Sequence, residues 1–261
     1  MAGTLRPEAD AVTLPIPPLP QPLPMPPSGR PELIAHRGAK REFRENTLPA
    51  FLRAVERGAD GIELDVHATA DGVVVVHHDP ILGAAMSDPA YAGRPLNAMS
   101  AAELRAEAYS DGTVVPTLAE VLAAVPAHVT IYVEVKAPGI EAAVARVIAP
   151  HASRVAVHAF DHRIPRAIAD AVPGVPAGIL QASYLIDAPA ALAAADARDL
   201  WQQWELVDPP LVRAVHAAGG RVIAWTANDP DAIRQLAEWG VDGLCCDDLR
   251  VARAALGDST R

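Results

Sequence analysis

The sequence has 261 residues, a formal net charge of −10 and a hydrophobic fraction of 51%. This composition is sufficient for a sizeable core, so we expect a globular protein. The acidic balance excludes an extended surface for nucleic acid, which requires a basic face, and any bound phosphate must therefore meet local cations. Every apolar run is interrupted well before the ~20 residues that a membrane span requires. We therefore expect no integral membrane association.

The first 30 residues, MAGTLRPEADAVTLPIPPLPQPLPMPPSGR, are too rich in proline for a helix or a strand. We expect residues 1–30 to form an extended or disordered arm, and residues 31–261 to form a single folded domain. Two alternatives stay open for the arm. It can act as a proline-rich ligand for a partner domain, or it can be a segment upstream of a start at Met25.

The two cysteines of the chain, Cys245 and Cys246, are adjacent. A disulfide between neighbouring residues is sterically poor. We therefore expect a reducing, cytoplasmic location, and we interpret Cys246 as a small core residue without a catalytic role.

From residue 33 onward, short apolar runs alternate with alanine-rich helical patterns, as is typical of parallel α/β architecture. Helices such as NDPDAIRQLAEWG begin with Asn or Asp followed by Pro and end at Gly. The expected strands are residues 33–36, 61–66, 129–135, 154–160, 177–181, 199–203, 221–226 and 243–247. Eight strands close a (β/α)₈ TIM barrel, so this is the predicted fold.

One segment breaks the alternation of strands and helices. GIELDVHATADGVVVVHHDP predicts an extended run, a turn at Asp-Gly and a second extended run, which together form a hairpin. The returning arm would bring His78 back towards the strand that carries Glu63 and Asp65. An irregular inserted segment of about residues 80–115 follows, with its own short helix, SAAELRAEA. The predicted fold is therefore a barrel with a small insertion after the second strand and its hairpin.

Polar residues gather where the first three strands end, which is where βα loops of a barrel carry catalytic groups. The pairs are His36 with Arg37, Glu63 with Asp65, and Glu134 with Lys136. The last two pairs have i, i+2 spacing, so each shares one face of its strand, here the lumen. Buried charges are costly unless they are paired or bind a metal. Three carboxylates at one mouth predict a hard divalent cation, Ca²⁺ or Mg²⁺.

Each of these residues also has a purely structural interpretation. A single carboxylate at a strand end is commonly a helix cap or part of a salt bridge, His36 can bond a backbone carbonyl, and Arg37 can form a surface ion pair. His78 is favoured over His77, which alternation places on the opposite side of the strand. Lys136 is one of only two lysines among 22 basic residues, which indicates a need for a compact ammonium group.

Taken together, two His, three carboxylates, one Arg and one Lys indicate phosphate-ester chemistry. One His can deprotonate an attacking hydroxyl while the other protonates the leaving alkoxide. The cation, Arg37 and Lys136 would neutralise the charge that develops on the phosphoryl oxygens.

The runs IAHRG, ENTLPAF, GADGIELDV, DGVVVVHHDP, PTLAEVL, VEVK, WTANDP and GVDG occur in this order between Leu33 and about Leu249. In these motifs the chain resembles the glycerophosphodiester phosphodiesterase family. The resemblance implies a TIM-barrel catalytic domain and metal-dependent hydrolysis of a glycerophosphodiester to glycerol 3-phosphate and an alcohol, through a cyclic phosphate. It also implies a role in scavenging phosphate, glycerol and headgroups from lipid breakdown.

The resemblance assigns roles residue by residue. His36 and His78 match the general acid–base pair of the family. The implied metal ligands are Glu63, Asp65 and Glu134. The implied substrate-binding residues are Arg37, Glu45, Lys136 and Trp225.

Departures from the family pattern leave the alcohol headgroup open. Arg44 replaces the usual Pro before ENT, Ala159 replaces a common Ser, and the segment after His78 lacks the usual Asp-Arg-Thr-Thr signature. The oligomeric state is equally open.

Two alternative functions follow from the same residues. A lysophospholipase D-like or cyclising phosphodiesterase would require an apolar groove beside the mouth, which Ile81, Leu82 and Met86 could supply, although core packing explains these residues equally well. A non-catalytic barrel would bind a phosphodiester or use the proline-rich arm for docking. The sequence lacks HExxH, P-loop and Gly-x-Ser-x-Gly motifs, which argues against the enzyme classes that use them.

Overall fold

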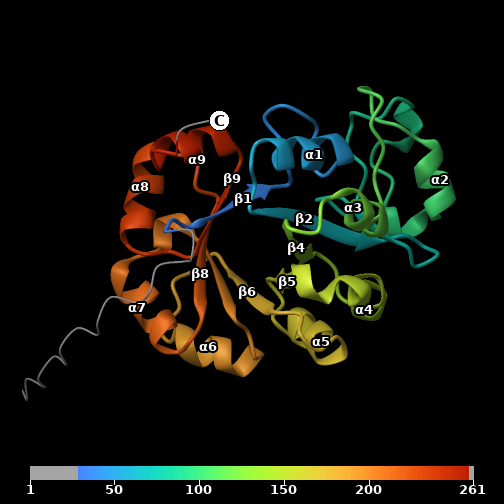
Figure 1. The fold of residues 1–261 in the computed structure, drawn as a ribbon. Helices are drawn as coiled ribbons and strands as arrows, with labels where there is room; N and C mark the ends of the chain where they lie inside the picture. Colours follow the sequence, from blue (N-terminus) through green and yellow to red (C-terminus); the bar gives the residue numbers. More distant parts are fainter. Residues whose placement is uncertain (1–28, 259–261) are drawn as a thin grey trace, which may run out of the picture.

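The computed structural model describes residues 29–258, so nearly all of the predicted proline-rich arm lies outside the described residues. Eight parallel strands form a closed barrel, because β1 pairs with both β2 and β9 (Figure 1). The barrel strands are β1 (Glu32–His36), β2 (Gly61–Ala68), β4 (Thr130–Val135), β5 (Val155–Ala159), β6 (Ala177–Gln181), β7 (Asp199–Gln203), β8 (Arg221–Trp225) and β9 (Gly243–Cys246). The predicted TIM barrel is therefore confirmed.

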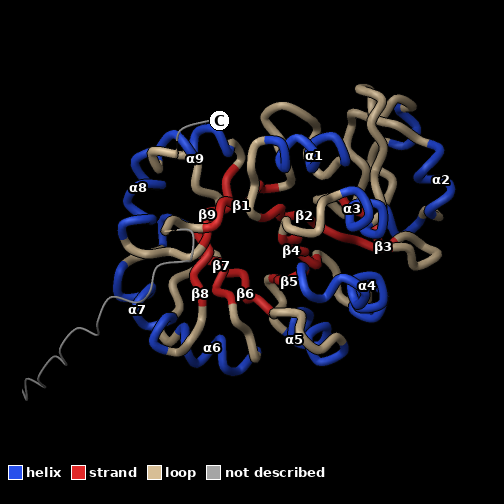
Figure 2. The backbone as a smooth tube through the Cα atoms, viewed as in Figure 1, coloured by secondary structure: helices blue, strands red, loops and turns tan. Residues whose placement is uncertain are grey.

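A ring of helices surrounds the strands, as Figure 2 shows. The helices of this ring are α1 (Leu48–Glu56), α3 (Leu118–Ala124), α4 (Glu141–Ile148), α5 (Arg163–Ala171), α6 (Ala188–Ala195), α7 (Pro209–Ala217), α8 (Pro230–Glu238) and α9 (Leu249–Ala255). Short 3₁₀ segments lie at Pro89–Tyr91, Leu96–Ala98, Ala149–Arg154 and Trp204–Leu206. No helix within residues 29–258 is long and apolar enough to cross a membrane.

The predicted start and stop signals explain where the helices lie. The side chains of Asp208 and Asp229 cap α7 and α8 by accepting backbone N–H bonds, and a proline follows each in the first turn. Helix α1 ends before Gly58, whose φ of +76° is the left-handed conformation that glycine adopts without strain. Because the eight barrel strands are parallel, the carboxyl ends of all of them lie at the same rim of the barrel.

Alternating strand residues divide the core into two layers. Leu33 and Ala35 of β1 belong to the layer between strands and helices, whereas Ile34 points into the barrel. The inward layer is built from Ile34, Tyr132, Ala156, Leu180, Trp201, Ile223 and Cys245. Cys245 and Cys246 are both free and buried, in the inner and outer layer respectively. Apolar packing therefore fills the barrel interior below the polar residues at its mouth.

The predicted hairpin and insertion form a small annex to the barrel. β3 (Val74–Val76) pairs antiparallel with the end of β2, and the insertion carries α2 (Ala101–Ala106), which begins with a capping box between Ser100 and Glu103. Figure 1 shows this segment beside α1 and α3, at the right of the view. It has a separate apolar cluster, which consists of Val75, Leu82, Met86, Leu96, Met99, Leu104, Tyr109 and Val115.

The annex distinguishes core packing from an apolar groove for two of the three residues Ile81, Leu82 and Met86. Leu82 and Met86 are only 1% and 5% exposed, because both pack in the annex cluster, and Ile81 alone of the three is exposed. Core packing, the alternative interpretation of these residues, therefore holds for Leu82 and Met86.

Candidate active site

The carboxyl ends of the barrel strands enclose one cavity. Seven residues that we selected from the sequence line it: His36, Arg37, Glu63, His78, Glu134, Lys136 and Trp225. Asp65 is fully buried beside them, 3.6 Å from the Nζ atom of Lys136. Glu45 lines an adjoining pocket, which shares His78 with the central cavity. The structure thus brings all nine predicted residues into one region.

His36 is held by a carboxylate that sequence reasoning missed. Its Nδ1 atom lies 2.7 Å from Oδ1 of Asp247, the residue that follows β9. Burial lowers the pKa of His36, and the hydrogen bond to Asp247 only partly opposes this shift, while the nearby charges of Arg37 and Lys40 reinforce it. The imidazole is therefore neutral at neutral pH, with one ring nitrogen engaged by Asp247.

His78 lies where the returning arm of the hairpin reaches the barrel mouth. The backbone N–H of His77 donates to the Asp65 carbonyl (3.0 Å), which ties this arm to β2. Nδ1 of His78 lies 2.8 Å from Oδ1 of Asp79, and its ring borders both the cavity and the adjoining pocket. His77 borders only the adjoining pocket, and its Nδ1 bonds the Asp79 carbonyl. Of the two histidines, therefore, only His78 borders the central cavity.

Arg37 is fixed by three carboxylates around it. Its φ of +59° turns its backbone N–H onto Oε2 of Glu63 (3.1 Å), while Nη1 donates to Glu45 (2.9 Å) and Nε lies 3.1 Å from Asp65. Burial would lower the pKa of Arg37, but these negative charges outweigh it and raise the pKa. The guanidinium is therefore a fixed positive charge.

Glu45 connects the cations at the rim of the site. Its second oxygen lies 2.9 Å from Nζ of Lys40, and Lys40 also approaches Asp247 at 3.6 Å. Burial would raise the pKa of Glu45, but Arg37 and Lys40 lower it to about 2. Glu45 therefore orients Arg37 as an ionised carboxylate.

The pKa values of the three inner carboxyls are shifted in different directions: those of Glu63 and Glu134 are raised, and that of Asp65 is lowered. Burial raises the pKa of Glu63 well above its usual value, and the charges of Asp65 and Glu134 raise it further. Burial and Asp65 also raise the pKa of Glu134, to about 6, although Lys136 donates to it at 2.8 Å. Asp65 is the reverse: despite burial, Arg37, Lys136 and a 2.8 Å bond from Asn46 lower its pKa. The cluster thus has more negative charge than its cations neutralise, which fits a divalent cation.

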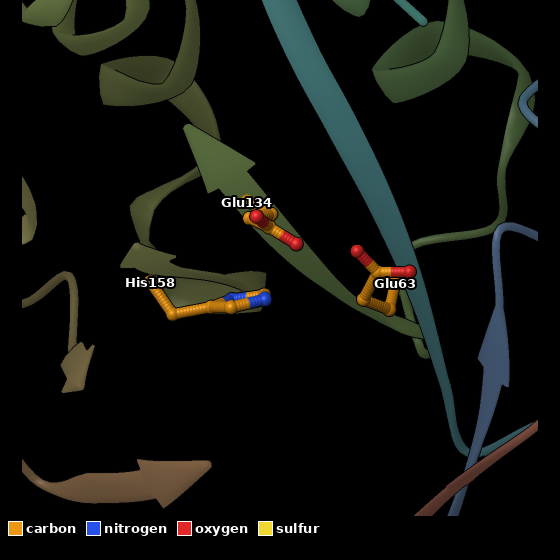
Figure 3. A group of neighbouring side chains, drawn as sticks. All are labelled: Glu63, Glu134 and His158. Carbon is orange, nitrogen blue, oxygen red and sulfur yellow. The ribbon is translucent and has the colours of Figure 1, made fainter. Parts of the chain in front are cut away.

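A second residue that sequence reasoning missed lies in this cluster. Among residues 29–258, ligand atoms of Glu63, Glu134 and His158 all lie within 4.8 Å of one another (Figure 3). The available signal was a histidine inside the apolar strand run VAVHA, because a polar residue in a buried parallel strand requires a partner. For Asp247, the signal was an acidic residue at the end of the last strand, which a closed barrel places beside the first.

Aromatic side chains form one wall of the cavity. Trp225 and Phe160 contact each other edge to face, with ring centroids 5.9 Å apart, and Phe160 is half exposed. Arg44, where the family pattern has Pro, lies with its guanidinium 4.2 Å above the Tyr109 ring and donates to Asp111. The Arg44 departure therefore joins the rim of the site to the annex.

The barrel and its mouth together define a class of enzyme. A TIM barrel with paired imidazoles, clustered carboxylates, an Arg and a Lys at the carboxyl ends of its strands has the groups that phosphate-ester chemistry requires. Comparison with known proteins makes this class specific.

The model of the glycerophosphoryl diester phosphodiesterase family matches residues 36–251. The chain therefore belongs to this family, whose enzyme class is phosphoric diester hydrolase. It is 29% identical to a glycerophosphodiester phosphodiesterase from Caldanaerobacter subterraneus subsp. tengcongensis, over 83% of this chain and 93% of the relative.

The chain is also similar in structure to solved phosphodiesterases. A phosphodiesterase from Oleispira antarctica, in complex with the product sn-glycerol-3-phosphate, superposes with a TM-score of 0.79 at 25% identity, covering 88% of this chain and 98% of that one. A glycerophosphodiester phosphodiesterase from Thermotoga maritima superposes with a TM-score of 0.73 at 25% identity, covering 85% and 96%.

Proposed function

We propose that this protein hydrolyses glycerophosphodiesters to glycerol 3-phosphate and an alcohol, with His36 and His78 as the acid–base pair and a divalent cation at the carboxylates. The observation that carries the proposal is the convergence of His36, His78, Arg37, Lys136 and the acidic cluster on one cavity. The product complex of the Oleispira antarctica relative supports the choice of substrate class. The two free cysteines fit a cytoplasmic location.

We assign the general base to His36 on the basis of its contact with Asp247. Because Asp247 engages Nδ1, the Nε2 atom is left to take the proton from the attacking hydroxyl. The lowered pKa keeps His36 neutral, and therefore able to accept a proton, at neutral pH. His78, which lines the same cavity, protonates the leaving alkoxide as the glycerol hydroxyl forms the cyclic phosphate. Water then opens this ester, giving its proton to His78 while His36 returns a proton to the glycerol oxygen, so both imidazoles are restored.

Charge on the phosphoryl group is met by side chains that are already fixed. Arg37 is held by Glu45 and Lys136 by Glu134, so both cations are in place before substrate binds. Glu63, Asp65 and Glu134 would hold a cation, Ca²⁺ or Mg²⁺ on the basis of their oxygen donors. When bound, this cation supplies a further positive charge for the phosphoryl oxygens. Trp225 and Phe160 would form the wall against the glycerol or alcohol moiety.

The direct test uses metal-stripped protein with glycerophosphocholine or glycerophosphoethanolamine, with Ca²⁺ or Mg²⁺ added in parallel. We expect metal-dependent release of glycerol 3-phosphate, and a loss of about 10²–10⁴-fold in kcat/KM for His36→Ala, because the variant removes the general base. His128→Ala is the matched control, because His128 is exposed in the loop before β4.

Other outcomes of this test point to other functions. Faster turnover of detergent-dispersed lysolipid than of either water-soluble diester would favour the lysophospholipase D-like activity. Metal binding without release from any of these substrates would favour a non-catalytic barrel.

A further inference from the structure

His158 is a buried histidine for which the proposed acid–base mechanism has no use. It lies on β5, where the register places it directly beside Glu134 of β4. Only 2% of the residue is exposed, and its ring is stacked on Trp201 at a centroid distance of 4.1 Å and an interplanar angle of 6°. The orientation of the ring is therefore fixed by packing.

One nitrogen atom of this ring, Nδ1, lacks a partner that would explain its position. Nδ1 is buried, and no atom of residues 29–258 hydrogen-bonds to it. Figure 3 shows the nitrogen-bearing edge of the ring directed towards Glu134 and Glu63. A buried polar atom without a partner is costly, so a ligand in this space would remove that cost.

The spacing of the three side chains suits a single ion. Their ligand atoms lie within 4.8 Å of one another, and two ligand atoms on opposite sides of one ion with bonds of about 2.1 Å lie about 4.2 Å apart. Small rotations of the two Glu side chains would therefore bring their oxygen atoms and the fixed imidazole onto a common centre. Asp65 accepts from Asn46 through Oδ2, and its Oδ1 atom is also buried without a hydrogen-bond partner among residues 29–258, so it stays available to the same ion.

We propose that His158 is an additional ligand of the divalent cation at Glu63 and Glu134, and that it shifts the preference of the site towards Mn²⁺ or Co²⁺ and away from Mg²⁺ and Ca²⁺. Mg²⁺ and Ca²⁺ are hard ions that select oxygen ligands, whereas imidazole nitrogen suits transition ions. This inference rests on the proposed function only in taking the carboxylates as the cation site.

Two other roles for His158 make different predictions. If the ring serves only to pack on Trp201, its nitrogen atoms will not contact a bound ion. If it donates a hydrogen bond to a phosphoryl oxygen, its loss will weaken substrate binding and leave cation affinity unchanged.

The first measurement is pulsed electron paramagnetic resonance of the full chain loaded with Mn²⁺, which detects ¹⁴N bonded to the ion without any turnover. We expect ¹⁴N modulation in the wild type and in His36→Ala and His78→Ala, and its loss in His158→Gln. Incorporation of [¹⁵N]histidine in the wild type should replace the ¹⁴N signal, which keeps the test decisive even if His158→Gln does not fold.

The second measurement is calorimetric titration with Mn²⁺ and with Mg²⁺. We expect His158→Gln to weaken Mn²⁺ binding at least tenfold and Mg²⁺ binding less than about threefold, because a nitrogen ligand contributes more to the transition ion. His128→Gln is the matched control and should change neither affinity.

The outcomes separate this inference from the proposed function. Mn²⁺ that binds without ¹⁴N modulation, or modulation that persists in folded His158→Gln, overturns the role of His158 and leaves the diesterase intact. Cation binding that is unaffected by Glu134→Gln overturns both the inference and the cation site on which it rests.

Discussion

At the scale of single residues, the site is organised by what surrounds each carboxylate. Glu63 and Asp65 are two residues apart on β2, yet the pKa of Glu63 is raised and that of Asp65 is lowered. Asp65 has the charges of Arg37 and Lys136 and a bond from Asn46, whereas Glu63 faces two carboxylates. The unfavourable charge is thus concentrated on the side chains nearest to the expected cation.

Glu63→Gln should therefore stabilise the metal-free protein. A carboxyl whose folded-state pKa is raised favours folding below its unfolded pKa and loses that contribution as pH rises through the folded pKa. At pH 7 the unfolded chain gains from ionising Glu63, whereas the folded chain does not, and the neutral Gln removes this cost of folding. We expect the free energy of unfolding to increase by at least ~1 kcal/mol, which is roughly 2–4 °C in Tm. The measurement is thermal unfolding in chelator. Glu205→Gln, at an exposed position, should leave Tm unchanged, and a lower Tm for Glu63→Gln would contradict the argument.

Asp247→Asn tests how His36 is held. Because the bond to Asp247 raises the pKa of His36 against the effect of burial, its loss should lower that pKa further. We expect the acidic limb of the kcat/KM profile to move to lower pH, and the maximum to fall at least about tenfold, because the ring loses its fixed orientation. A limb that stays in place or moves to higher pH would show that Asp247 does not act through His36.

At the scale of elements, the strands could be predicted because parallel barrel strands are continuous apolar runs. The helices between them begin at Asn or Asp followed by Pro and end at Gly, which marks where each strand stops and starts. β6 and β7 match their predicted ranges, β5 is one residue shorter than predicted at each end, and the other barrel strands differ by one or two residues at one end. β2 extends to Ala68 rather than residue 66, because β3 pairs with its last residues. That extension depends on a partner strand, which local propensity does not contain.

The site residues could likewise be predicted where they share one strand, but not where the contact depends on which strands are neighbours. The i, i+2 spacing within one strand was sufficient to place Glu63 with Asp65 and Glu134 with Lys136. Asp247 and His158 required knowledge of which strands are neighbours: β9 beside β1, and β5 in register with β4. These contacts join residues up to 211 positions apart, so sequence spacing carried no direct signal for them.

The annex is an element with its own core, and we propose that it opens separately from the barrel. Leu104, 2% exposed, belongs to the annex cluster and not to the barrel core. Leu104→Ala should cost about 2–5 kcal/mol in the annex alone, because the cavity forms there. Hydrogen exchange should therefore accelerate over residues 80–115 while β5 to β8 keep their protection. Uniform acceleration across the barrel would show a single cooperative unit.

At the scale of the whole molecule, the barrel mouth of an acidic chain holds both of its lysines and Arg37, and these cations still leave the inner carboxylates undercompensated. The pKa of Glu45 is lowered to about 2, so its contribution to folding is present above its usual pKa near 4.5 and is lost as pH falls towards 2. Glu134 has the opposite sign, because its pKa is raised to about 6 and protonation between about 4.5 and 6 favours the folded state. In the metal-free protein, Glu45 therefore favours folding above about pH 4.5 and Glu134 favours it below about pH 6, while the lowered pKa values of His36 and His158 favour folding as pH rises towards 6.5.

A bound cation should reverse the effect of pH on stability that comes from Glu63 and Glu134. It binds the ionised carboxylates, so protons compete with it as pH falls through the raised pKa values of Glu134 and Glu63. Apparent affinity should fall about tenfold per pH unit for each proton displaced below pH 6, and the Tm increase on adding the cation should shrink with it. Thermal unfolding from pH 5 to 8, with and without the ion, measures both effects. In Glu63→Gln/Glu134→Gln the cation should give no Tm increase at any pH, and a pH-independent increase in the wild type would place the cation away from these carboxylates.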